Sequence, residues 1–190
     1  MPQASPRRTE LLEAAYRYVL AHGLTDLSLR PLAAAIGSSP RVLLYLFGSK
    51  DGLVQALLAR ARAGELAMLD ELGAADDTPA AIAGRLWAWL SREDHRGFLV
   101  LWVEGYARSL VDPDGPWAGF ARATVEDWLA VLAAAEPTDR RADAAGPARH
   151  TRVLALLRGA LLDLLATGES DRVGRAVELG IAELTRECTR

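Results

Sequence analysis

Two short helical patterns separated by a single glycine are the feature that most constrains how this chain can fold. They lie in the stretch LSLRPLAAAIGSSPRVLLYLFGSK. Ser28 is placed to cap the first pattern, which ends at Gly37. Ser39 with Pro40 begins the second pattern, which ends at Gly48. Because helices of this length are marginal alone, both must pack against a third helix.

The helix that receives them is predicted directly upstream. Leu12, Ala15 and Val19 follow helical spacing. Gly23 stands where a glycine is expected just after a helix end. Three helices with a glycine-containing turn between the last two form a helix-turn-helix unit. We therefore expect a three-helix helix-turn-helix domain over residues 1–50.

The second short helix is predicted to keep one side uncovered. Its inward positions are predicted to be Leu43, Leu46 and Phe47. At about 100° per residue, the opposite side then carries Arg41, Val42, Leu44 and Tyr45. Arginine pairs with guanine edges, and an aliphatic side chain packs on a thymine methyl group. This side therefore has the chemistry of a major-groove reader.

Charge is divided unevenly along the chain. Residues 1–63 contain eight Arg and Lys against four Asp and Glu, whereas residues 64–190 contain fourteen against twenty-one. A basic head on an acidic body is typical of a protein that meets a polyanion at one end. Lys50, the only lysine, stands at the predicted start of the next helix, where free amide N–H groups also attract phosphate.

The remainder of the chain is also predicted to be helical. Of its 190 residues, 51% are apolar and only 6% aromatic, and alanine and leucine dominate, which favours helix over sheet. Periodicity predicts further helices at about 50–72, 78–91, 94–111, 117–135, 148–167 and 171–188. The predicted fold class is therefore all-α with about nine helices, in which residues 51–190 form a helical body.

Several classes of protein are not expected. No apolar run reaches the length of about 18 residues that a membrane span needs, and no secretory leader is visible, so we expect a cytoplasmic protein without a membrane partner. The motifs of P-loop proteins, zinc proteases and serine hydrolases are absent. The three histidines and the single cysteine are not spaced as metal ligands. We therefore expect no enzyme activity, no cofactor and no metal.

The segment from Thr9 to Leu58 resembles the DNA-binding domain of the tetracycline-repressor (TetR) family. The turn AAAIGSS, a Leu-x-x-x-Phe core pair and FGSKDGL running into the next helix carry the resemblance. The chain departs from the family at Leu44, where tyrosine is common, and at Arg41 and Val42, where glycine and threonine are common. The resemblance implies DNA contacts by Ser28, Arg30, Ser39, Pro40, Arg41, Val42, Tyr45 and Lys50.

The resemblance also implies that helices of the body enclose a ligand cavity. The predicted lining consists of aromatic residues that gather in one stretch: Trp87, Phe98, Trp102, Tyr106, Trp117, Phe120 and Trp128. Such a lining suits a flat or bulky apolar effector, and ordinary core packing is the alternative for each ring. Glu104, in the same stretch, either faces a cationic ligand or pairs with Arg108 one turn on.

The last two helices are predicted to form a dimer seam. Apolar residues follow helical stripes on both, and the resemblance implies a four-helix seam with two helices from each subunit. The predicted interface residues are Leu154, Leu157, Leu161, Val173, Val177, Gly180, Ile181 and Leu184. A core within one subunit is the alternative for these stripes.

Together these features predict a ligand-responsive transcription regulator. We expect a homodimer that represses by binding a palindromic operator in double-stranded DNA and leaves it when a small apolar or aromatic effector binds. Two recognition helices about 34–36 Å apart would meet successive major-groove faces. Effector binding is expected to tilt the fourth helix and splay the two heads. The alternative is a helical ligand-binding or scaffold dimer that does not bind DNA.

Overall fold

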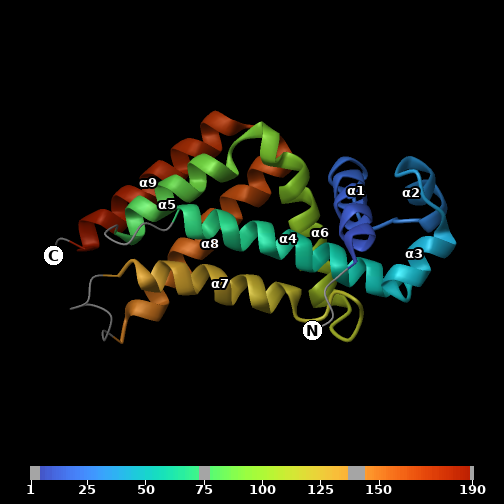
Figure 1. The fold of residues 1–190 in the computed structure, drawn as a ribbon. Helices are drawn as coiled ribbons and strands as arrows, with labels where there is room; N and C mark the ends of the chain where they lie inside the picture. The colour runs from blue at the N-terminus through green and yellow to red at the C-terminus, as the bar shows by residue number, and fades with distance from the viewer. Residues whose placement is uncertain (1–4, 73–77, 137–143, 189–190) are drawn as a thin grey trace. The chain divides into compact units, whose positions relative to one another are not determined.

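The computed structural model describes residues 5–72, 78–136 and 144–188. Within these ranges it contains nine α-helices, one short 3-10 helix (η1, Glu93–His95) and no strand, which confirms the all-α prediction (Figure 1). The α-helices are α1 (Pro6–His22), α2 (Leu29–Ala35), α3 (Pro40–Phe47), α4 (Lys50–Leu72), α5 (Pro79–Leu90), α6 (Arg96–Val111), α7 (Phe120–Ala134), α8 (Gly146–Thr167) and α9 (Ser170–Cys188).

Local sequence signals account for most helix ends. Gly23 follows α1 with φ of 80°, a conformation in which a side chain would be strained. The Ser39 hydroxyl accepts a hydrogen bond from the Val42 N–H at 3.3 Å and begins α3. α7 begins three residues later than predicted because the chain turns at Gly119, where φ is 75°. Capping hydrogen bonds and glycines therefore set several of the helix ends.

The helices pack as two compact units. The N-terminal unit combines Met1–Gly64 with Gly97–Ala123, and the C-terminal unit combines Glu65–Arg96 with Thr124–Arg190. The first therefore contains α1 to α3, most of α6 and the first part of α4. The boundary predicted after residue 50 separates a DNA-binding domain from a helical body by function. It remains a prediction.

In the N-terminal unit, α6 approaches the backbone of α1. A Cβ atom added at Gly97 would lie 2.5 Å from the Leu20 carbonyl oxygen, so only glycine fits without a shift. Further along α6, the Glu104 carboxylate accepts a hydrogen bond from the Leu24 N–H at 2.7 Å. The sequence suggested that Glu104 faces a cationic ligand or pairs with Arg108. In the structure its carboxylate instead binds the turn after α1, because α6 packs against that turn.

Helix α4 contacts α1 in the same unit through the side chain of Arg60. Arg60 donates a hydrogen bond to Glu13 at 2.5 Å, and its guanidinium lies 4.8 Å from the centre of the Tyr16 ring. The hydrogen bond to Glu13 raises the pKa of Arg60, which keeps the guanidinium charged. Burial raises the pKa of Tyr16, and the nearby Arg60 charge partly opposes that rise.

The C-terminal unit is built on α5, α8 and α9, which pack on one another (Figure 1). Gly180 permits the approach of α9 to α8, since an added Cβ would lie 2.6 Å from Leu156 Cδ2. At the turn between these helices, Arg172 donates two hydrogen bonds to Asp163, at 2.8 and 2.7 Å. This bidentate pair lowers the pKa of the Asp163 carboxyl group.

A second charged cluster follows the end of α7. Glu136 is buried, accepts a hydrogen bond from Arg149 at 2.9 Å and has His150 Nε2 at 2.7 Å. Burial alone would raise the pKa of Glu136, but these hydrogen bonds outweigh it and lower the pKa. The cluster ties the end of α7 to the start of α8.

No single helix among the described residues is long and apolar enough to cross a membrane. Only α3 and α4 taken together reach the required length and hydropathy, and they meet at an angle of 70°.

A pair of glycine substitutions tests the close approach of α6 to α1. We expect Gly97→Ala to lower the free energy of unfolding by about 1–3 kcal/mol, because a Cβ cannot fit beside the Leu20 carbonyl without backbone movement. Gly84→Ala on α5 is the matched control, since nothing lies within 4 Å of an added Cβ there. It should raise stability by about 0.4–1 kcal/mol. Urea denaturation followed by circular dichroism measures both, and equal effects would contradict the packing described.

Candidate nucleic-acid interface

The eight-residue helix α3 has one buried side and one exposed side. Leu43 and Phe47 are buried against the rest of the unit. Tyr45 is 86% exposed, and the apolar side chains of Val42 and Leu44 are 37% and 40% exposed. Arg41 is exposed as well. Leu46, the third residue predicted to face inward, is half-buried. The predicted orientation is therefore confirmed for Leu43 and Phe47, and α3 presents an arginine, a tyrosine and two aliphatic side chains to solvent.

A surface groove lies beside α3. Its volume is about 680 Å³, and its lining includes Ser28, Arg30, Pro40 and Lys50. The structure thus brings four of the eight predicted DNA-contact residues together, from the start of α2, the start of α3 and the start of α4. Thr25 also lines the groove and is not among the predicted residues.

Five basic residues of the N-terminal unit fall into two groups. Arg7 pairs with Glu10 at 2.8 Å, and Arg60 pairs with Glu13. Arg30, Arg41 and Lys50 are exposed, and the described part of the chain provides them with no ion pair or hydrogen bond. The second group is therefore available to a polyanion. Acidic side chains neutralise the first group, whereas the second group places three positive charges on α2, on α3 and at the start of α4.

Serines 28 and 39 stand at the starts of α2 and α3 but differ in role. The Ser39 hydroxyl caps α3, whereas the Ser28 side chain makes no capping bond and is exposed. An exposed hydroxyl beside the groove is free to accept or donate a hydrogen bond to a phosphate. Ser39 acts on α3 itself, by fixing its first turn.

The seven aromatic residues predicted to line one pocket divide between the two units. Trp87 and Trp128 belong to the C-terminal unit, and the other five belong to the N-terminal unit. Trp128 is buried and its indole N–H donates a hydrogen bond to the Glu65 carboxylate at 2.5 Å. Trp102 and Tyr106 are in contact, with ring centres 5.1 Å apart, and Phe98 is half-buried.

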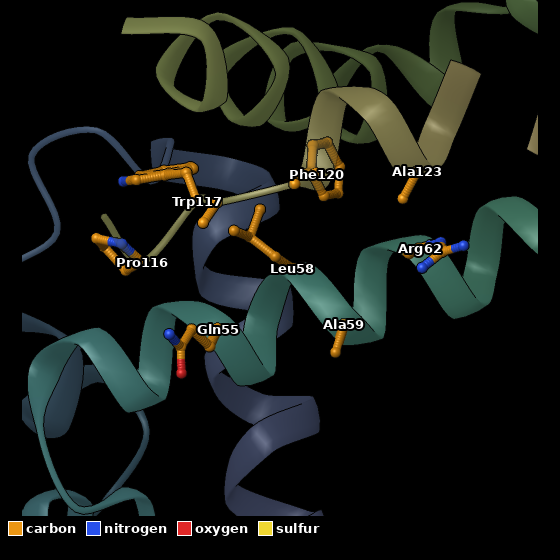
Figure 2. Close-up of a pocket in the computed structure, with 10 residues that line it drawn as sticks. Gln55, Leu58, Ala59, Arg62, Pro116, Trp117, Phe120 and Ala123 are labelled. Carbon is orange, nitrogen blue, oxygen red and sulfur yellow. The ribbon is translucent and has the colours of Figure 1, made fainter. Parts of the chain in front are cut away.

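Trp117 and Phe120 line a pocket in the N-terminal unit (Figure 2), and the other five predicted rings do not. The pocket has a volume of about 330 Å³. Its other wall is α4, which contributes Gln55, Leu58, Ala59 and Arg62. These four residues follow the i, i+3, i+4, i+7 spacing of one helix face, a signal that is present in the sequence but equally typical of core packing.

The predicted interface residues of α8 and α9 are mostly buried within the single chain. Exposure is low for Leu154, Leu157, Leu161, Val173, Val177 and Leu184, and intermediate for Gly180 and Ile181. Their burial is expected of the sides on which α5, α8 and α9 pack. These side chains therefore fill the core of the C-terminal unit.

The described residues contain no group of three or more His, Cys, Asp or Glu side chains that could hold a metal ion. In the charged clusters described above, an acidic side chain is paired with Arg or His: Glu136 with His150, and Asp163 with Arg172.

Comparison with known proteins agrees with this geometry. Residues 11–57, which include α2, α3 and the beginning of α4, match the model of the bacterial regulatory proteins of the tetR family. The N-terminal part of the chain therefore carries a domain of the tetR-family type. No curated protein matches the sequence.

Solved structures extend the similarity beyond residues 11–57. A transcriptional regulator from Rhodococcus sp. Rha1 aligns with a TM-score of 0.76 and 20% identity, over 95% of this chain and 96% of that one. Salmonella enterica GusR aligns with a TM-score of 0.72 and 22% identity, over 97% and 96%. The multidrug binding protein EbrR, solved with ethidium, aligns with a TM-score of 0.71 and 27% identity, over 95% and 98%. The TetR-like fold therefore covers nearly the whole chain.

The two serines allow a direct test of the site's construction. We expect Ser39→Ala to lower the free energy of unfolding by about 0.5–2 kcal/mol, because an N-cap hydrogen bond to α3 is lost. Ser28→Ala removes a hydroxyl that makes no capping bond and should stay within about 0.5 kcal/mol of the parent. Urea denaturation of both variants checks this, and an equal loss from both would contradict the different roles of the two hydroxyls.

Proposed function

We propose that this chain is a transcriptional repressor that binds a palindromic operator as a homodimer and releases it when a small apolar or aromatic molecule binds. The observation that carries the proposal is the exposed side of α3, which lies next to three basic side chains without partners among the described residues. A short helix held by its buried side and open on the other fits the major groove.

The contacts to DNA divide by chemistry. Arg30 and Arg41 are proposed to read bases, since a guanidinium pairs with guanine in two hydrogen bonds. Lys50, Ser28 and Tyr45 are proposed to hold phosphates, which fix the position of the protein on the duplex. Val42, with an exposed aliphatic side chain, is proposed to pack on a thymine methyl group, and Leu44 offers the same chemistry. Ser39 and Pro40 hold the start of α3.

The dimer is proposed to form through the outward sides of α8 and α9. Most of the residues predicted for the seam are buried in the core of the C-terminal unit, and they hold α8 and α9 in position for the dimer contact. On the outward side of α8, Ala155, Gly159, Leu162 and Ala166 form an exposed stripe of small and apolar residues. On α9, Leu179 is 60% exposed. Such a stripe permits close packing of helices from two subunits.

The proposed effector follows from the aromatic pocket and from EbrR. EbrR has been solved with imidazole, ethidium and proflavin. A cyclic, planar molecule is therefore our proposed class of effector. Binding would favour a state in which α4 is tilted and the two α3 helices no longer match the groove spacing, so the effector must bind that state more tightly.

The same proposal covers location and chemistry. A DNA operator in a bacterium lies in the cytoplasm, so we place the protein there. The matched family consists of regulatory proteins, and we propose that this chain has no enzyme activity and needs no cofactor.

DNA binding is tested with Arg41→Ala and Lys50→Ala. The operator is first selected from the DNA that flanks the protein's own gene. Arg41→Ala should weaken the free energy of operator binding by about 1–3 kcal/mol and relax the sequence preference at one position. Lys50→Ala should weaken binding to all DNA sequences alike. It should also reduce the slope of log affinity against log salt concentration by about one, because it removes one phosphate contact. Fluorescence anisotropy at several salt concentrations measures both.

Arg175→Ala is the matched control for these variants. Arg175 is an exposed arginine on α9, where it lies 3.6 Å from Glu178. Its removal should leave operator affinity unchanged. If the parent protein binds no DNA sequence more tightly than random duplex, repression is excluded and the alternative of a dimer without DNA binding stands.

The seam is tested by placing a charge on α8. We expect Leu162→Arg to weaken the dimer at least about tenfold, because an unpaired charge would be buried in the seam. Leu110→Arg on α6 is the control, since Leu110 is 65% exposed and lies in the N-terminal unit. Sedimentation velocity measures the oligomeric state of each, and a dimer that tolerates Leu162→Arg would move the seam elsewhere.

A further inference from the structure

We propose that Asp26 limits the strength of DNA binding, because its carboxylate repels the phosphate that the basic residues of the groove beside α3 attract. The inference rests on the proposed function in one respect, that this groove meets DNA. It adds a residue that was not predicted to face DNA and that acts against binding.

Asp26 is the acidic member of the groove lining. The eight described residues of that lining include two cations, Arg30 and Lys50, and the exposed Ser28. The Asp26 side chain is exposed, and no described residue forms an ion pair or a hydrogen bond with it. Its carboxylate is therefore a free negative charge in a groove whose other charged side chains are positive.

The backbone that carries Asp26 is held in place. Asp26 is a central residue of the turn from Leu24 to Leu27, which is closed by a hydrogen bond from the Leu27 N–H to the Leu24 carbonyl oxygen at 3.2 Å. Both leucines are buried, with exposures of 1% and 4%. The Leu24 N–H also donates to the Glu104 carboxylate at 2.7 Å. The turn therefore cannot move Asp26 out of the groove without the loss of buried contacts.

A phosphate that approaches Lys50 through this groove also approaches the Asp26 carboxylate. Charges that share a groove of about 680 Å³ lie within roughly one Debye length of each other, about 8–10 Å at physiological salt, so their repulsion is only partly screened. Every DNA sequence carries the same phosphates, so the repulsion acts on operator and random duplex alike. Asp26 therefore sets the overall affinity and leaves the choice of sequence to the base contacts.

A direct contact with a base is the other role that a carboxylate can have, since it accepts a hydrogen bond from the amino group of cytosine. Asp26 lies in the turn before α2, two positions from Ser28, and shares the groove with Lys50. Both of these neighbours are proposed to hold phosphates. The two roles predict opposite results, because removal of a base contact weakens operator binding and removal of a repulsion strengthens it.

The test compares the full-length parent with Asp26→Asn and Asp26→Ala by fluorescence anisotropy, on operator and on random duplex. The buffer contains EDTA, so that no divalent cation bridges the carboxylate and a phosphate. At low salt each variant should bind both duplexes about three- to tenfold more tightly. The gain should shrink as the NaCl concentration rises, because salt screens the repulsion. The ratio of operator to random affinity should stay within about twofold of the parent's.

Asp114→Asn is the matched control for the change in net charge. Asp114 is exposed, has no partner among the described residues and belongs to the same compact unit, but it lies outside the groove lining. This variant should leave both affinities within about twofold of the parent's. The two substitutions of Asp26 separate charge from new contacts, since asparagine adds N–H donors and alanine does not. Urea denaturation of each variant checks that the fold is retained.

The possible results distinguish these roles. Unchanged or weaker binding by the Asp26 variants would overturn the inference, and so would a gain confined to Asp26→Asn or an equal gain from Asp114→Asn. A changed sequence preference would show a base contact and would overturn it as well.

The parent protein separates this inference from the proposed function. If the parent prefers its operator and the Asp26 variants show no gain, only the role of Asp26 fails. If the parent has no preferred sequence and the variants bind random duplex more tightly, the role of Asp26 stands and the repressor proposal fails.

Discussion

The backbone approach of α6 to α1 is the constraint on which the DNA-binding face depends. Helices α2 and α3 contain only seven and eight residues, too few to be stable without support. Their support is α1 and α4, which are joined by Arg60, Glu13 and Tyr16. Helix α6 completes the unit through the contact at Gly97 and the Glu104 bond to the turn after α1. The geometry of the exposed face is thus set by the helices that pack behind it.

Much of the fold could be predicted because its signals are local. Gly23 and Gly48 end helices for conformational reasons, and Ser39 and Thr78 begin them through hydrogen bonds to nearby N–H groups. The exposed side of α3 followed from its spacing, since a helix with Leu43 and Phe47 buried has only one side left. Ser28 shows the limit of such signals: its residue type suits a cap, but its side chain makes no capping bond.

Features that depend on distant packing could not be predicted in the same way. An apolar stripe on α8 or α9 has the same pattern whether it fills its own core or meets a second subunit. Leu157 and Val177 are buried within the single chain, in the unit where α5, α8 and α9 pack on one another. Aromatic residues close in sequence were assigned to one pocket, yet Trp128 satisfies a buried carboxylate in the other unit. Glu104 accepts a hydrogen bond from the backbone N–H of Leu24, 80 positions away in the sequence, and no local pattern indicates such a contact.

The solitary lysine gives the protein an unusual chemical handle. Every other cationic side chain that the sequence provides, apart from the histidines, is a guanidinium, so reagents selective for side-chain amines have one target in the chain. That target, Lys50, is exposed beside α3 and the groove. A fluorophore, a crosslinker or an acetyl group attached there would sit on the surface proposed to meet the duplex and would leave the rest of the fold unlabelled.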